Sequence, residues 1–166
     1  MSFKNTDVGH KIILAGVDGC GKSTLAKKIQ QEIYPDMNYK IVHSTRTTKN
    51  DLLYFEDLLD SPDNIIFDRF YIDQFVYQTA KERIENHWLT LSDLDIIENK
   101  VSADEHEIIF VDTDLNTCLL NCLKDSEDYN YNIEYITDLY KRYQYFFSYI
   151  SQIPYSIYKN DFKREI

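Results

Sequence analysis

Short apolar segments alternate along the chain with longer segments in which apolar residues recur every three or four positions. The apolar segments are typical of strands buried on both faces of a parallel sheet, and they lie at 11–16, 39–44, 64–68, 107–112 and 155–158. The longer segments predict helices at 22–34, 50–60, 71–88, 92–100, 115–124 and 133–150. This alternation predicts an α/β fold of three layers, a five-stranded parallel sheet flanked by helices on both faces.

Particular residues mark where the predicted helices begin and end. Ser92 and Asp114 are expected N-caps, because their side-chain oxygens can accept hydrogen bonds from the free N–H groups of a first turn. Pro35 is expected to end the helix that begins at Lys22. Because the pattern contains no repeat and no Gly/Pro-rich linker, residues 1–166 are predicted to form a single domain.

The composition is that of a soluble globular protein and argues against binding to long nucleic acids or to membranes. Hydrophobic residues make up 43% and charged residues 28% of the 166 positions. A net charge of −10 disfavours long nucleic acids and anionic membrane surfaces, and no apolar segment is long enough to span a membrane. Cys20, Cys118 and Cys122 are an odd set without CxxC spacing, which indicates free thiols in the cytoplasm. Small buried side chains are their expected role.

The sequence GVDGCGKST at 16–24 contains three of the chain's four glycines and matches G-x-x-x-x-G-K-[ST] between a predicted strand and a predicted helix. Backbone N–H groups of such a loop, with the N-terminus of the helix, bind phosphate oxygens. The expected ATP-binding residues are Gly16, Gly19, Cys20, Gly21, Lys22, Ser23 and Thr24. Within this set, Lys22 is expected at the β- and γ-phosphates and Ser23 at Mg²⁺.

A second group of polar residues follows the strands. Asp68 and Asp112 fall at the carboxyl ends of their predicted strands, as the Gly-rich loop does, and ligands of parallel sheets bind at these ends. An acid beside a phosphate-binding loop suits Mg²⁺, directly or through water, so Asp68 is a second expected metal ligand. The adjacent Arg69 can bind phosphate through two parallel hydrogen bonds.

Four segments resemble the thymidylate kinases, a family of P-loop nucleoside monophosphate kinases. GVDGCGKST is similar to the family's G-x-D-G-x-G-K-[ST], and DRFYIDQFVYQ at 68–78 is similar to D-R-Y-x-x-S-x-x-A-Y-Q. HSTRTT at 43–48 resembles the T-R-E-P segment, and FVDTDLNTCL at 110–119 resembles the L-D-V segment. The matching residues of the last three segments are Asp68, Arg69, Tyr77, Gln78, Thr45, Arg46 and Asp112.

The resemblance implies roles for individual side chains. Lys22, Arg69 and Asp18 are the implied catalytic residues, with Arg69 bridging the donor and acceptor phosphates and Asp18 near the acceptor's 3′-hydroxyl or the metal. The implied acceptor site consists of Asp18, Arg46, Arg69, Phe70, Gln74 and Tyr77. In this site Arg46 holds the 5′-phosphate, while Phe70 either stacks on the acceptor or packs in the core.

The expected reaction is Mg²⁺-dependent transfer of a phosphoryl group from ATP to a deoxynucleoside 5′-monophosphate, with dTMP or a related pyrimidine nucleotide as the leading acceptor. The chain departs from the family in three ways: it is shorter, it has no base-reading arginine between Arg46 and Asp68, and its lid, at about 124–132, has no arginine. Lys124 is the nearest cation and Arg142 a distant one, whereas Asn121 stands where the family often has arginine.

These departures leave two alternatives open. The acceptor can be a nucleoside, a modified nucleotide or a polynucleotide end, or the protein can bind nucleotides with little transfer. The aromatic side chains of the helix over 133–150 predict either a homodimer interface or additional core packing.

Overall fold

Five parallel strands form a single sheet in the computed structural model, which describes residues 7–44, 51–80, 89–125 and 133–160. The strand order is β2-β3-β1-β4-β5, and every pair of neighbours is parallel. The bounds are β1 (Lys11–Ala15), β2 (Lys40–Val42), β3 (Ile65–Asp68), β4 (Glu107–Asp112) and β5 (Ser156–Lys159). The predicted sheet is confirmed, although β2 is shorter than the segment predicted for it.

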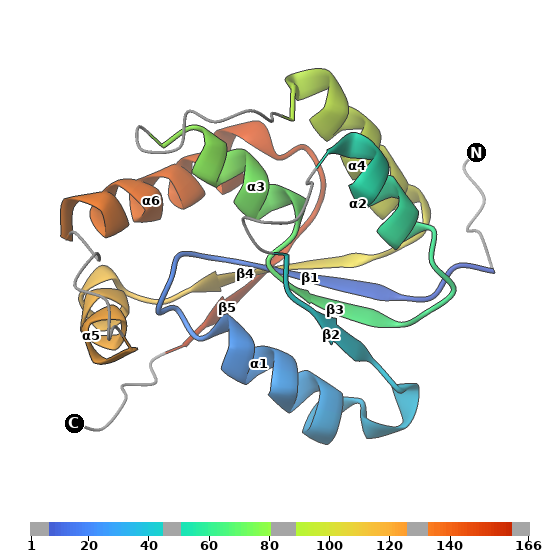
Figure 1. The fold of residues 1–166 in the computed structure, drawn as a ribbon, viewed down its shortest axis with the longest axis horizontal. Coiled ribbons are helices and arrows are strands. Elements are labelled where there is room, and N and C mark those ends of the chain that lie inside the picture. The colour runs from blue at the N-terminus through green and yellow to red at the C-terminus, as the bar shows by residue number, and fades with distance from the viewer. Residues whose placement is uncertain (1–6, 45–50, 81–88, 126–132, 161–166) are drawn as a thin grey trace.

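Helices flank the sheet on both faces, as predicted: α1 lies on one side in Figure 1, and α2, α3, α4 and α6 lie on the other. Their bounds are α1 (Lys22–Lys28), α2 (Leu52–Leu59), α3 (Tyr71–Gln78), α4 (Leu91–Ala103), α5 (Leu115–Asp125) and α6 (Ile133–Tyr145). Short π-helical segments, Ile29–Ile33 and Phe146–Ile150, continue α1 and α6. No helix among the described residues is both long and apolar enough to cross a membrane.

The helix ends differ in part from those predicted. Asp114 caps α5, because its carboxylate accepts a hydrogen bond from the Thr117 N–H at 3.0 Å. The prediction for Ser92 is wrong, since Thr90 is the N-cap of α4 and exchanges hydrogen bonds with Asp93 in a capping box. The helix predicted over 71–88 ends earlier, at Gln78, and residues 81–88 lie outside the described residues.

Aromatic and aliphatic side chains from both helical layers meet the buried strands. Every residue of β1 is buried, and Cys20, Cys118 and Cys122 are buried free cysteines, as predicted. From the aromatic segment at the C-terminal end of α6, Phe146 and Phe147 belong to this core, whereas Tyr145 and Tyr149 are exposed. Core packing therefore accounts for part of the aromatic pattern, and the homodimer remains a prediction.

A buried lysine secures the start of β1. The Lys11 ammonium group donates hydrogen bonds to the backbone carbonyls of Gly9, Ser61 and Asp63 at 2.7–2.8 Å. Burial lowers the pKa of Lys11 to about 8, against the opposing effect of nearby carboxylates, of which Asp63 has the largest effect. Because the unfolded chain keeps the ordinary lysine pKa, it binds more protons than the folded chain between these two values.

We expect Lys11→Met to lower the free energy of unfolding by about 2–3 kcal/mol, because three buried carbonyls lose their donor. The deficit relative to wild type should widen as the pH rises from 8 towards 10.5, where protonation of Lys11 no longer favours the unfolded wild-type chain. Urea denaturation at several pH values measures both effects. Lys40→Met, which removes an exposed lysine paired with Asp63, is the control. A deficit that shrinks with rising pH would contradict the account.

Candidate functional site

The Gly-rich loop between β1 and α1 adopts a conformation that requires glycine at two positions. Gly19 and Gly21 have φ angles of +80° and +98°, in the left-handed region that other residues rarely adopt. A Cβ atom on Gly19 would also lie 2.5 Å from the carbonyl oxygen of Cys118 and 3.0 Å from the sulfur of Cys122. The absence of a side chain at Gly19 therefore allows the loop to lie close against α5 (Figure 1).

Hydrogen bonds from neighbouring segments hold the loop carbonyls. The Cys20 carbonyl accepts from the Thr113 hydroxyl at 2.7 Å and from the Asn160 amide at 3.0 Å. Asn121 on α5 donates its side-chain amide to the Gly19 carbonyl at 2.9 Å. Carbonyls held from outside suit a phosphate-binding loop, because its N–H groups then face the anion.

Lys22 is the first residue of α1, and its side chain extends into the loop. Its buried ammonium group donates hydrogen bonds to the carbonyls of Gly16 and Val17, the second at 3.3 Å. Burial lowers the pKa of Lys22, but the neighbouring Cys20 and then the Asp73 and Asp68 carboxylates raise it by more, so that the net shift of the pKa is upward. The loop therefore holds a positive charge where phosphate oxygens are expected.

Ser23 and Asp68 come together beside Lys22. The Ser23 hydroxyl donates to the Asp68 carboxylate at 2.5 Å, which joins the start of α1 to the end of β3. Nδ1 of His43 lies 3.4 Å from the same carboxylate oxygen. A hydroxyl and a carboxylate side by side are the oxygen ligands that Mg²⁺ prefers, so these side chains fit the predicted metal site. Thr24, the next residue of α1, is exposed.

A charged cluster connects the loop to α3. The Arg69 guanidinium forms an ion pair with the Asp18 carboxylate, which also accepts a hydrogen bond from the Tyr77 hydroxyl at 2.9 Å. The guanidinium carbon lies 5.4 Å from the centroid of the Tyr77 ring, within the range of a cation–π contact. The structure thus brings together three predicted site residues, Asp18 from the loop, Arg69 from the end of β3 and Tyr77 from α3.

Arg69 also has an unusual backbone. Its φ angle of +81° lies in the left-handed region, which costs a non-glycine residue on the order of 1–2 kcal/mol. Such strain is common at functional sites, where the surrounding contacts hold it. The conformation occurs between the last residue of β3 and the N-cap of α3, Phe70.

The contacts around this turn include two side chains that sequence reasoning did not assign to the site. The buried Asp73 carboxylate accepts from the Phe70 N–H at 3.0 Å and from the hydroxyl of Tyr143 on α6. Burial, together with the Asp73 charge, raises the pKa of Tyr143 well above its ordinary value, so that its hydroxyl keeps its proton. A carboxylate in the first turn of a helix is a capping signal that identifies Asp73, whereas no local signal identifies Tyr143.

Other predicted site residues lie apart from this cluster or outside the described part of the chain. Phe70 is 1% exposed and packs on the rings of Phe67 and Phe55, so the structure favours its core role over stacking on the acceptor. Gln74 is half-buried on α3. Arg46 and residues 126–132 of the predicted lid lie outside the described residues.

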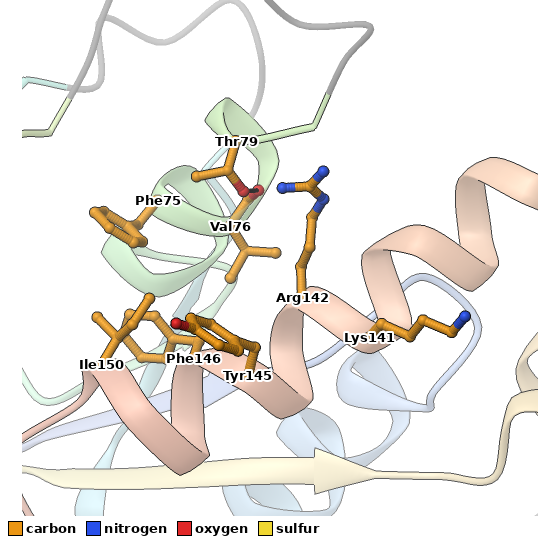
Figure 2. A pocket seen from close by; sticks show the side chains of 8 residues that line it. All are labelled: Phe75, Val76, Thr79, Lys141, Arg142, Tyr145, Phe146 and Ile150. Carbon is orange, nitrogen blue, oxygen red and sulfur yellow. Dashed lines mark hydrogen bonds between the residues drawn. The ribbon is translucent and has the colours of Figure 1, made fainter.

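Arg142, the distant candidate for a lid arginine, belongs to a different feature. Its Nε donates to Asp138 at 2.7 Å, one turn earlier on α6. Figure 2 shows it at a pocket of about 350 Å³ between α3 and α6. The pocket is lined by Phe75, Val76, Thr79, Lys141, Arg142, Tyr145, Phe146 and Ile150, none of which belongs to the phosphate-binding loop.

The fold has counterparts among known proteins, although no protein-family model matches the chain. The chain is 29% identical over 133 residues to the SPbeta prophage-derived uncharacterized protein YorR of Bacillus subtilis (strain 168), covering 78% of this chain and 79% of YorR. The crystal structure of YorR in complex with phosphorylated GDP superposes with a TM-score of 0.70 at 25% identity, covering 91% of this chain and 85% of that one.

Deoxyadenosine kinase from M. mycoides is a second structural neighbour. Its complex with dATP superposes with a TM-score of 0.54 at 21% identity, over 92% of this chain and 91% of that one. The complex with dCTP gives 0.55 at 18%, over 91% and 89%. The chain has a P-loop nucleoside kinase-like fold. At these identities the likeness to the deoxyadenosine kinases concerns the fold alone.

Proposed function

We propose that this P-loop protein transfers the γ-phosphoryl group of ATP to the 5′-phosphate of a deoxynucleoside monophosphate, with dTMP or a related pyrimidine nucleotide as the leading acceptor. The observation that carries the proposal is the cluster of Asp18, Arg69 and Tyr77 next to the phosphate-binding loop. A protein that only binds ATP has no need of an arginine held at the far side of this loop. A phosphotransferase needs one, because charge on the transferring group must be neutralised.

The donor half of the site follows from the loop. Its N–H groups and the start of α1 bind the phosphates of ATP, and Lys22 neutralises charge on the β- and γ-phosphates. Ser23 and Asp68 would hold Mg²⁺, which when bound supplies further positive charge to these oxygens. Lys22 exchanges its present carbonyl acceptors for phosphate oxygens, so its charge is already desolvated and in place.

The acceptor half requires positioning rather than proton transfer. An acceptor phosphate is ionised at neutral pH, so its oxygen attacks the γ-phosphorus directly as the bond to the β-phosphate oxygen breaks, giving ADP and a nucleoside diphosphate. Arg69 exchanges Asp18 for the two phosphates, and Asp18 then accepts a hydrogen bond from a sugar hydroxyl. Arg46 is proposed for the 5′-phosphate, and Gln74 and Tyr77 for the walls of the acceptor pocket.

The phosphorylated GDP bound to YorR supports a nucleotide ligand for this chain as well. A nucleoside acceptor is the second candidate, because the Asp18 carboxylate next to Arg69 would be the base for its 5′-hydroxyl. A nucleoside acceptor requires such a base, because its 5′-hydroxyl must lose a proton as it attacks the γ-phosphorus.

A coupled assay of ADP formation over the common deoxynucleosides and their 5′-monophosphates tests the proposal. We expect turnover with dTMP or another pyrimidine monophosphate well above the rate with ATP and Mg²⁺ alone. The matched pair of thymidine and dTMP separates the candidates, because they differ only in the 5′-phosphate. Turnover of thymidine but not of dTMP would establish the second candidate, and no turnover above the ATP-only rate would contradict both.

A further inference from the structure

We infer that Asp73 and Tyr143 are positioning residues that hold Arg69 in its left-handed conformation and thereby set the rate of phosphoryl transfer. The inference rests on the proposed function, since it concerns the arginine assigned to the transferring group. Both side chains act on the turn that carries Arg69.

Asp73 restrains the backbone immediately after Arg69. Its Oδ2 accepts from the N–H of Phe70 at 3.0 Å, and this N–H belongs to the peptide group that joins Arg69 to Phe70. The orientation of this peptide group determines the ψ angle of Arg69, whose φ angle is +81°. The capping bond therefore stabilises a turn that a non-glycine residue otherwise avoids.

Tyr143 holds the other oxygen of the same carboxylate. Its hydroxyl donates to Oδ1 of Asp73, and the two side chains are 1% and 3% exposed. A hydrogen bond to a charged acceptor is stronger than one between neutral groups, and the absence of water strengthens it further. Asp73 is thereby fixed from two sides, by the backbone of its own turn and by α6.

The same tyrosine supports the far end of the arginine. The Tyr143 ring packs edge-on against the Tyr77 ring, with the centroids 6.4 Å apart. Tyr77 in turn contacts the Arg69 guanidinium through its ring and Asp18 through its hydroxyl. α6 thus reaches both the backbone and the guanidinium group of Arg69 through a single residue.

The alternative is a purely structural role, in which Tyr143 only holds α6 against α3. The chain offers a matched control variant that separates the two roles. Tyr71, also fully buried on α3, donates its hydroxyl to the buried Glu98 carboxylate of α4 at 3.2 Å. The two tyrosine–carboxylate bonds are alike in chemistry and burial, but only the one from Tyr143 leads to Arg69. Tyr71→Phe and Tyr143→Phe each remove one hydroxyl and keep the ring.

The experiment compares kcat, the KM for ATP and the thermal unfolding midpoint of these variants. We expect Tyr143→Phe to lower kcat about tenfold or more, the equivalent of a hydrogen bond to a charged group, with the KM for ATP changed by less than about twofold. Tyr71→Phe should lower the unfolding midpoint comparably and leave kcat unchanged. An unchanged kcat in Tyr143→Phe, or an equal loss in both variants, would overturn the inference.

A double mutant tests whether the effect passes through Arg69. In an Arg69→Ala background, Tyr143→Phe should cause no further loss of the residual kcat, because residues that act through one another are not additive. An additional tenfold loss would assign Tyr143 a role independent of Arg69 and overturn the inference.

A measurement on the protein without nucleotide separates this inference from the proposed function. The NMR resonance of the Arg69 Nε–H group, assigned by its loss in Arg69→Lys, should shift or broaden in Tyr143→Phe and keep its position in Tyr71→Phe. An unchanged resonance would contradict positioning even in an active enzyme. Failure of the wild-type protein to phosphorylate any acceptor would instead contradict the proposed function, and the resonance would still report on the turn.

Discussion

Lys22→Met should lower kcat by about 10³-fold or more under saturating substrates, effectively abolishing phosphoryl transfer. Methionine has a similar volume but no charge, so the substitution removes the cation from inside the loop without leaving a cavity. The ammonium group is already desolvated there and held by the carbonyls of Gly16 and Val17. The uncharged methionine side chain that takes its place cannot neutralise the charge that develops between the β- and γ-phosphates. The coupled assay of ADP formation measures this loss.

Lys27→Met is the matched control, since it replaces an exposed lysine of the same helix. It should leave kcat within about twofold of wild type, because an exposed charge on the far part of α1 is screened by solvent. Urea denaturation of both variants verifies that each is folded. A Lys22→Met protein that is folded and retains wild-type turnover would refute the assignment of the phosphate site.

Arg69→Ala has the second large effect, which should fall on transfer and not on ATP binding. We expect kcat to decrease by about 10³-fold, the usual contribution of an arginine that neutralises a transferring phosphoryl group. The Kd for ATP, measured by titration calorimetry, should change by less than about threefold, because Arg69 pairs with Asp18 and is proposed to contact the acceptor phosphate. Arg69→Lys should restore little activity, since an ammonium group cannot make two parallel hydrogen bonds.

Arg142→Ala is the corresponding control for Arg69→Ala. It also tests whether Arg142 supplies the positive charge expected of a lid arginine. Arg142 pairs with Asp138 and lines the pocket between α3 and α6, so its removal should leave kcat within about twofold of wild type. A large loss of kcat in Arg142→Ala would show that this residue supplies the missing lid charge. Equal losses of kcat and ATP affinity in Arg69→Ala would place Arg69 on the donor instead.

Local rules were sufficient for the fold class and for the phosphate-binding loop. Continuous apolar segments predict buried parallel strands, and the positions of Gly16, Gly21 and Lys22 predict a strand–loop–helix that binds phosphate. These features depend on side-chain periodicity and on backbone conformations that only glycine readily adopts. For the same reason Asp68 was expected at a carboxyl end of the sheet, where it lies next to Ser23. The boundaries that were wrong, such as the N-cap of α4, involve choices between residues one or two positions apart that are both able to cap a helix.

The sequence alone therefore determined the parallel sheet, the loop and the residue types at its edge, because each follows from neighbours a few positions apart. Only the tertiary structure decided which of these residues meet. Tyr77 reaches Asp18 across 59 positions, Tyr143 reaches Asp73 across 70, and Asn121 reaches Gly19 across 102. Such contacts depend on how each crossover helix packs against the sheet, and no local pattern encodes that packing. The same packing buried Phe70 in the core, because the rings of Phe55 and Phe67 lie against it only in the folded chain.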